Sequence, residues 1–131
     1  MAWKMGLPVK KFIAATNAND IVPEYLRSSK FNPRPSVRTL SNAMDVGNPS
    51  NFPRILELYG GSYEKMVAHM TGVVYTDGQT RDIIKEVFQQ HEYLLCPHSA
   101  IGYAGLKAGL KDEHKATKGV FISTASPAKF G

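Results

Sequence analysis

An apolar run near the start of the chain limits the folds that this sequence can adopt. Residues 12–15, Phe-Ile-Ala-Ala, are apolar without the alternation of a strand that faces water on one side. We therefore expect a strand over residues 11–16 that is covered on both faces, as in parallel sheets. Residues 2–5 look like the last turn of a helix that Gly6 closes. A helix end followed by a buried strand indicates an α/β fold.

Two asparagines follow this strand directly and are candidates for a binding site. Asn17 and Asn19 lie just past its carboxyl end, where parallel α/β sheets hold their ligand-binding side chains. Asp20 has a simpler interpretation, because it precedes a helical pattern over residues 21–27 and can cap that helix. We therefore expect a capping role for Asp20 and keep the two asparagines as candidates to line a cleft.

Residues 41–54 form a loop that leads into a short helix. Turn-forming residues fill positions 47–51, and the apolar positions behind them predict a helix over residues 52–59 that a glycine pair ends. An asparagine at position 48 or 51 can cap this helix through its side chain. The free amides at the helix start also suit an anion, with four side chains to help bind it: Asn48, Ser50, Asn51 and Arg54. Most polar loops before a helix only cap it, so the pattern alone favours the simpler interpretation.

The rest of the chain predicts further elements of the same fold. We expect a helix capped by Ser62, followed by a brief strand at residues 73–75. The next helix should run from the capping box at residues 76–79 to about residue 90 and bury Ile83, Ile84, Val87 and Phe88. After it we expect a helix opening at His98 and Ser99, a strand over residues 119–124 and a last helix from Ser126. The small residues after His98 indicate close packing against a sheet. Together these elements predict one α/β segment over residues 1–131. It would be a mostly parallel sheet of about three or four strands with helices on both faces, cut from a larger doubly wound domain.

Composition argues against several function classes. The net charge is +5, but the basic residues are scattered and not interleaved with exposed-looking aromatics, so we expect no nucleic-acid partner. No apolar run reaches the ~18 residues of a membrane span, and the first residues hold no hydrophobic signal core. A single cysteine, Cys96, excludes an internal disulfide, so we expect a cytoplasmic chain without membrane contact. The four histidines show no metal-binding spacing, so no metal site is expected.

Four segments of the chain resemble, in the same order, signature segments of the threonine synthase family. They are residues 12–23 (FIAATNANDIVP), 45–54 (DVGNPSNFPR), 97–103 (PHSAIGY) and 123–130 (STASPAKF). Because four ordered segments are spread over nearly the whole chain, the resemblance is specific. One position differs: Cys96 stands before Pro97 where the family usually carries an aspartate, which puts in doubt any role that needs a charge there.

The resemblance implies a fold-type II enzyme that uses pyridoxal phosphate to convert O-phosphohomoserine and water to threonine and phosphate. The substrate-binding residues that it implies are Asn17, Asn19, Asn48, Ser50, Asn51 and Arg54. For Asn17 and Asn19 this means lining the active-site cleft, and for the other four it means holding the substrate anion. Thr124, or alternatively Ser123, would hydrogen-bond the pyridine nitrogen of the cofactor through a neutral hydroxyl.

The same resemblance implies that part of the enzyme is missing from this chain. No lysine here has the surroundings of the family's Schiff-base lysine, and no glycine-rich loop resembles the one that holds the cofactor phosphate. We therefore expect a piece of threonine synthase that is catalytically inactive alone and does not bind pyridoxal phosphate alone. Missing neighbours would leave apolar surface exposed and favour self-association. The alternative is a non-catalytic α/β module that binds an anion or a partner.

Overall fold

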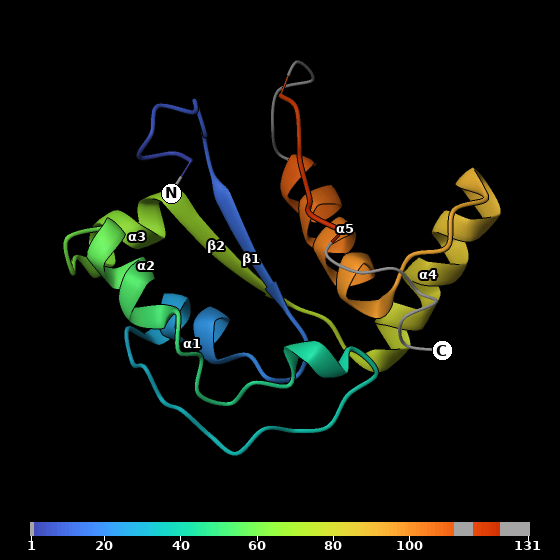
Figure 1. The fold of residues 1–131 in the computed structure, drawn as a ribbon, viewed down its shortest axis with the longest axis horizontal. Helices are drawn as coiled ribbons and strands as arrows, with labels where there is room; N and C mark the ends of the chain where they lie inside the picture. Colours follow the sequence, from blue (N-terminus) through green and yellow to red (C-terminus); the bar gives the residue numbers. More distant parts are fainter. Residues whose placement is uncertain (1, 112–116, 124–131) are drawn as a thin grey trace.

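The computed structural model describes residues 2–111 and 117–123 (Figure 1). Its elements are, in order, strand β1 (Phe12–Thr16), helix α1 (Ile21–Ser28), the short 3-10 helix η1 (Asn42–Met44), α2 (Phe52–Leu58), α3 (Tyr63–His69), β2 (Met70–Val74), α4 (Asp77–His91) and α5 (Pro97–Leu110). None of the helices in this part of the chain is long and apolar enough to cross a bilayer.

Two parallel strands form the sheet. β1 and β2 pair from Phe12 opposite Met70 to Thr16 opposite Val74, and α1, η1, α2 and α3 lie in the connection between them. The pairing confirms the strand near the start of the chain and the parallel sheet. The second strand begins at Met70 rather than at residue 73, where the β-branched run suggested its start. The α/β class predicted from the sequence is therefore confirmed.

The expected strand over residues 119–124 does not form as far as the structure describes it. Residues 119–123 have no regular secondary structure, and Thr124 and the helix expected from Ser126 lie outside the described residues. Val120 and Ile122 are 84% and 77% exposed. A strand needs a neighbour that takes up its backbone hydrogen bonds, and the sheet of the described residues contains only β1 and β2. The prediction of three or four strands is therefore wrong for this part of the chain.

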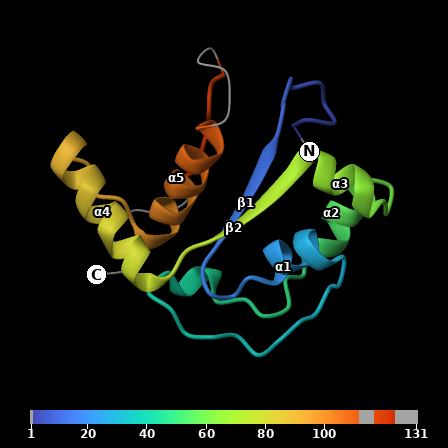
Figure 2. The same cartoon turned by 180° about the vertical axis from the view of Figure 1, so that it is seen from behind.

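Helices cover both faces of the sheet (Figures 1 and 2). On one face, a Cβ added at Gly72 of β2 would lie 2.6 Å from Pro23 Cα, so α1 rests directly on this glycine. On the other face, a Cβ added at Gly105 of α5 would lie 2.9 Å from Ala15 Cβ, so α5 lies equally close to β1. Both expectations, helices on two faces and close packing by the small residues of α5, are confirmed.

Two apolar clusters hold the helices to one another. The larger joins α1, α2 and α3 around Phe52 and Met66, which are 1% and 0% exposed. The smaller joins α4 to α5 around Val87 and Ala100. Phe88 was predicted to be buried, but it is 52% exposed. Neighbouring residues of a helix point about 100° apart, so the orientation that buries Val87 against α5 turns Phe88 outward.

Two helices begin at the predicted caps. The Ser62 hydroxyl accepts a hydrogen bond from the Lys65 N–H at the start of α3. At the start of α4, Thr76 and Gln79 form the predicted capping box, in which each side chain binds the other's backbone N–H. These local patterns were visible in the sequence because both partners of each bond lie within one turn.

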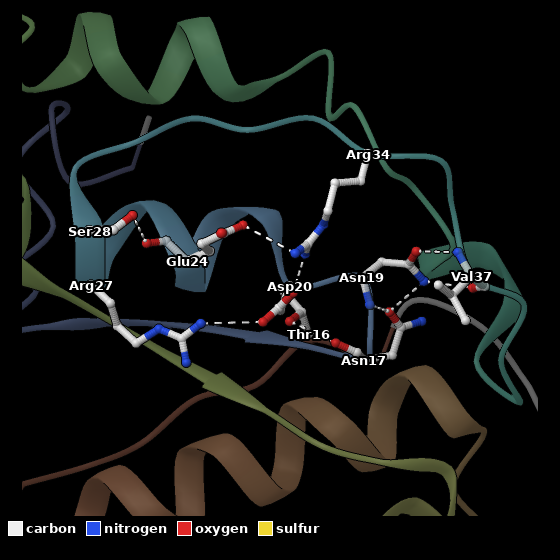
Figure 3. Close-up of polar contacts among 9 residues, drawn as sticks. All are labelled: Thr16, Asn17, Asn19, Asp20, Glu24, Arg27, Ser28, Arg34 and Val37. Atoms are coloured by element: carbon white, nitrogen blue, oxygen red, sulfur yellow. Dashed lines mark hydrogen bonds and ion pairs between the residues drawn. The ribbon is translucent and has the colours of Figure 1, made fainter.

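Two other predicted caps are wrong. Asp20 and Asn51 occupy the N-cap positions of α1 and α2, but neither makes a side-chain cap bond. The Asp20 carboxylate pairs instead with the guanidinium groups of Arg27 and Arg34 (Figure 3). Arg34 also pairs with Glu24 of α1. The Asp20 carboxylate therefore binds charged side chains instead of the free amides at the start of α1.

The first described residues close as a helix end does. Gly6 has a φ of +107°, and the N–H groups of Gly6 and Leu7 donate to the carbonyls of Trp3 and Ala2. Glycine-terminated helices end with this pair of hydrogen bonds. Residues 2–6 form turns rather than a helix, so the prediction is confirmed for the glycine and not for the helix before it.

Candidate functional site

Asn17 and Asn19 lie at the carboxyl end of β1, and their side chains face each other (Figure 3). They are 1% and 7% exposed. Asn17 Oδ1 accepts hydrogen bonds from the backbone N–H and the side-chain amide of Asn19, at 2.9 and 3.0 Å. Asn19 also binds both backbone groups of Val37, donating to its carbonyl at 2.8 Å and accepting from its N–H at 2.7 Å. The two side chains therefore hold the loop at residue 37 against the end of the strand.

The carboxylate of Asp45 completes this arrangement. Asp45 Oδ1 lies 3.0 and 3.2 Å from the side-chain amides of Asn17 and Asn19. The Thr39 hydroxyl donates to Oδ1 at 2.6 Å and the Thr39 N–H donates to Oδ2 at 2.9 Å. Asn17 Nδ2 is also 3.1 Å from Ser41 Oγ. We call these five residues, Asn17, Asn19, Thr39, Ser41 and Asp45, the asparagine cluster.

The asparagine cluster folds residues 37–45 back onto the end of β1. Asn17 and Asp45 are 28 positions apart in the sequence, so no local pattern pointed to Thr39, Ser41 or Asp45, and the sequence analysis missed them. The polar atoms of the two asparagines are satisfied by neighbours inside the protein, which is the usual state of buried polar groups. The structure thus places Asn17 and Asn19 beneath the loop. Their assignment to the lining of a cleft stays a prediction.

The loop after Asp45 carries the other predicted binding residues at the surface. Asn48, Ser50, Asn51 and Arg54 are all exposed. Behind them, the Gly47 carbonyl accepts from the Arg34 N–H at 2.9 Å, and the buried ring of Phe52 stacks on Phe31 with centroids 4.2 Å apart. The core therefore fixes this loop from behind and leaves its donors open to solvent, as binding loops require.

His98 links the same loop to the start of α5. Its Nε2 accepts a hydrogen bond from the Ala43 N–H at 3.0 Å, and on α4 the Asp77 carboxylate accepts from the Leu40 N–H at 3.0 Å. Burial lowers the pKa of His98, and the nearby Asp45 carboxylate opposes that shift. The carboxyl end of β1 and the amino ends of α4 and α5 therefore meet at residues 39–45. Ligands of α/β proteins bind at this edge of the sheet.

The predicted cofactor contact falls partly outside the described residues. Thr124 is not among them, whereas Ser123 shares a hydrogen bond of 2.9 Å with Ser99 Oγ in the first turn of α5. Ser99 Oγ lies 3.1 Å from Cys96 Sγ, and this sulfur caps α5 by accepting from the Ser99 N–H. An N-cap needs a side-chain acceptor, so Cys96 supplies one without a charge at the position where the resemblance led us to expect an aspartate.

The two halves of the predicted site belong to opposite sides of the sheet. α2, which follows Asn51, packs with α1 and α3, whereas Ser123 is bound to Ser99 of α5 (Figures 1 and 2). Residues 39–45 run between the two sides along the carboxyl edge, and the hydrogen bond from Ala43 to His98 joins them to α5. A cavity shared by the two halves stays a prediction.

Comparison with known proteins gives a consistent result. No protein-family model matches the chain. It is 45% identical to threonine synthase of Haemophilus influenzae over 131 residues, which is 99% of this chain and 29% of that protein. It is 38% identical to threonine synthase of Escherichia coli over 130 residues, again 99% of this chain and 29% of the relative.

Solved structures agree with these relatives. The crystal structure of Escherichia coli threonine synthase superposes with a TM-score of 0.84 at 38% identity, over 98% of this chain and 29% of that one. A threonine synthase from Brucella melitensis, solved with bound PLP, gives a TM-score of 0.86 at 31% identity, over 98% of this chain and 32% of that one. The chain therefore spans about three tenths of the length of the proteins that it matches.

Proposed function

We infer the function of this chain from the premise that it corresponds to one segment of threonine synthase, matched over 99% of its own length and 29% of a relative's. We propose that, together with the remainder of such an enzyme, it takes part in converting O-phosphohomoserine and water to threonine and phosphate. We also propose that its two-stranded sheet is part of the larger sheet of a fold-type II catalytic domain. The parallel pairing of β1 and β2, with helices on both faces, supports this assignment.

The segment would contribute the part of the site that holds the substrate's anionic group. The exposed donors on the loop after the asparagine cluster carry this proposal: Asn48, Ser50, Asn51 and Arg54. A guanidinium can bind two phosphate oxygens at once, and the neutral amide and hydroxyl groups can bind the others. Because the asparagine cluster and Phe52 fix the loop from behind, these donors need little ordering when a ligand arrives. The role of Asn17 and Asn19 in this scheme is to position the loop at the edge of the cleft.

The described residues fit only one contact of pyridoxal phosphate. A hydroxyl at residue 123, oriented by Ser99, could face the pyridine nitrogen, and Thr124 is our first candidate for that contact. The cofactor, when bound, withdraws electrons from the substrate. A neutral hydroxyl would leave the ring nitrogen largely unprotonated, which limits this withdrawal. We propose that the chain alone neither binds the cofactor nor catalyses the reaction, because it offers no lysine in the surroundings that the family's cofactor-linked lysine has.

The substrate role of Arg54 can be tested by direct binding. Calorimetric titration of the chain with O-phosphohomoserine should show about tenfold weaker binding for Arg54→Ala, because one charge-assisted hydrogen bond contributes about 1.5–3 kcal/mol. Arg38→Ala is the matched control, since Arg38 is equally exposed and has no proposed role. Equal affinity of the two variants would show that Arg54 does not bind the substrate.

The cofactor proposal has a separate test. The isolated chain mixed with pyridoxal phosphate should show the absorbance of the free cofactor, with no new band near the edge of the visible range. A new band that disappears when one lysine is replaced by alanine would show that the chain binds the cofactor covalently, and the proposed inactivity would then be wrong.

A second candidate function is a non-catalytic module that binds a partner or another copy of itself. It is favoured by large apolar side chains that remain exposed: Met5, Leu7, Val37, Phe88, Tyr93, Leu94, Val120 and Ile122. Exposed apolar surface of this kind is usually covered by another chain or by further parts of the same fold. Both candidates predict that these side chains pack against something outside the described residues.

A further inference from the structure

The protonation state of His98 determines whether its side chain can accept a hydrogen bond from the loop at residues 41–45. It is the second residue of α5, and its Nε2 accepts the Ala43 N–H at 3.0 Å. A nitrogen that accepts a hydrogen bond carries no proton, so the proton of the neutral ring is on Nδ1. Nδ1 lies 3.7 Å from Cys96 Sγ, a weak acceptor. The Ala43 contact therefore requires this neutral tautomer, and the Cys96 contact is compatible with it.

The surroundings of His98 favour that neutral form. The amino end of the 14-residue helix α5 carries partial positive charge, which disfavours an imidazolium. Burial acts in the same direction and lowers the pKa of His98. The opposing group is Asp45 on the facing loop. Cys96 contacts the ring at Nδ1, and Asp77 at the start of α4 binds Leu40 of the same loop.

We infer that His98 is a positioning residue that, as a neutral imidazole, fixes residues 41–45 against α5 and releases them when it is protonated. An imidazolium has no lone pair, so it cannot accept the Ala43 N–H and leaves that amide without its partner. Residues 46–54, which hold the proposed substrate-anion donors, follow directly on the released segment. This consequence for substrate binding rests on the function proposed above, whereas the contact itself does not.

The contact can be followed by NMR on the whole chain. In ¹H–¹⁵N spectra between pH 8 and 5, the Ala43 amide should shift in one step at a pH below about 6.5, the ordinary pKa of a histidine. Hydrogen exchange of residues 41–45, corrected for its intrinsic pH dependence, should speed up at least about tenfold over the same step. Absence of the step at Ala43 would overturn the inference.

Three variants separate the contact from general destabilisation. His98→Gln keeps a neutral acceptor near the position of Nε2, so the loop should stay protected and the pH step should vanish. His98→Ala should leave the Ala43 amide without its acceptor, and so in fast exchange, at every pH. His91→Gln is the matched control, because His91 is exposed at the end of α4, and it should leave the step unchanged. If the pH step at Ala43 persists in His98→Gln, the step belongs to another titrating group, and the inference is wrong.

Sulfate distinguishes this inference from the proposed function, since its charge does not change between pH 8 and 5. If sulfate binds the loop residues 48–54, its affinity should fall at the pH of the Ala43 step in the unaltered chain and stay constant in His98→Gln. Sulfate that fails to bind at any pH, with the Ala43 step present, would count against the proposed anion site alone. Sulfate binding without any pH step would overturn the role of His98 alone.

Discussion

At the scale of single residues, the half-buried carboxylate of Asp45 is stabilised by neutral donors. The side-chain amides of Asn17 and Asn19 and both donors of Thr39 surround it within 3.2 Å. The stability of such an arrangement depends on every member, because a polar group that is removed from water and loses its hydrogen-bond partner destabilises the folded state. The sequence shows the two asparagines, but their partners come from a loop more than 20 positions later.

Replacing Asn17 should expose this dependence. Asn17→Ala removes the amide from Asp45 and Ser41, so we expect the free energy of unfolding to fall by about 1–3 kcal/mol. Urea denaturation measures the change. Asn48→Ala is the control, because Asn48 is exposed, and it should change stability by less than about 0.5 kcal/mol. Similar losses in the two variants would mean that the asparagine cluster does not stabilise the fold.

At the scale of elements, close contact between helices and strands depends on glycines, which have no side chain at the point of contact. Gly72 of β2 lets α1 approach through Pro23, and Gly105 of α5 lets that helix approach Ala15 of β1. The number of small residues in α5 predicted close packing on its side of the sheet. On the other side, Gly72 is a single glycine in a short strand, and its role is evident only once α1 lies on it.

A methyl group at Gly72 should separate these elements. In Gly72→Ala the new Cβ would lie 2.6 Å from Pro23 Cα, and α1 must move, so we expect a loss of about 1–3 kcal/mol. Gly78→Ala in α4 is the matched control, because its new Cβ would have only Thr76 Oγ1 within 4 Å, at 3.9 Å. Alanine favours a helix, so the control should be neutral or more stable by up to about 1 kcal/mol. Thermal unfolding of both variants measures these changes in stability. Equal stability of the two variants would contradict the close contact of α1 with β2.

At the scale of the whole molecule, the described fold leaves apolar surface uncovered. Val120 and Ile122 are 84% and 77% exposed, and they flank Phe121, which packs against the cluster of α4 and α5, in a run that pairs with neither described strand. Relatives that this chain matches are more than three times as long. We expect parts of a complete enzyme, or another copy of this chain, to cover that run.

Self-association should therefore increase with protein concentration. Sedimentation velocity over a hundredfold range of concentration should show larger species at the upper end. Val120→Lys combined with Ile122→Lys should reduce them, because burying the two new charges against another chain would be costly. Gln89→Lys is the control, since Gln89 is polar and exposed on α4, so the added charge covers no apolar surface. A monomer at every concentration would contradict the expectation.

Features that depend on neighbours within one turn or one strand could be predicted from the sequence alone. They are β1, the capping box of α4, the cap of α3, the glycine turn after α2 and, through four ordered segments, the similarity to threonine synthases. The physical reason is that these choices follow from local hydrogen bonds and apolar periodicity, which every chain with the same short pattern shares.

Contacts between distant segments became evident only from the three-dimensional fold. It paired Asp20 with Arg34 instead of the start of α1, turned Phe88 outward, and joined Ala43 to His98 across 55 positions. It also assigned Asn17 and Asn19 to the support of the loop. These outcomes depend on where a connection brings its residues after the core has formed, which no short stretch of the sequence specifies.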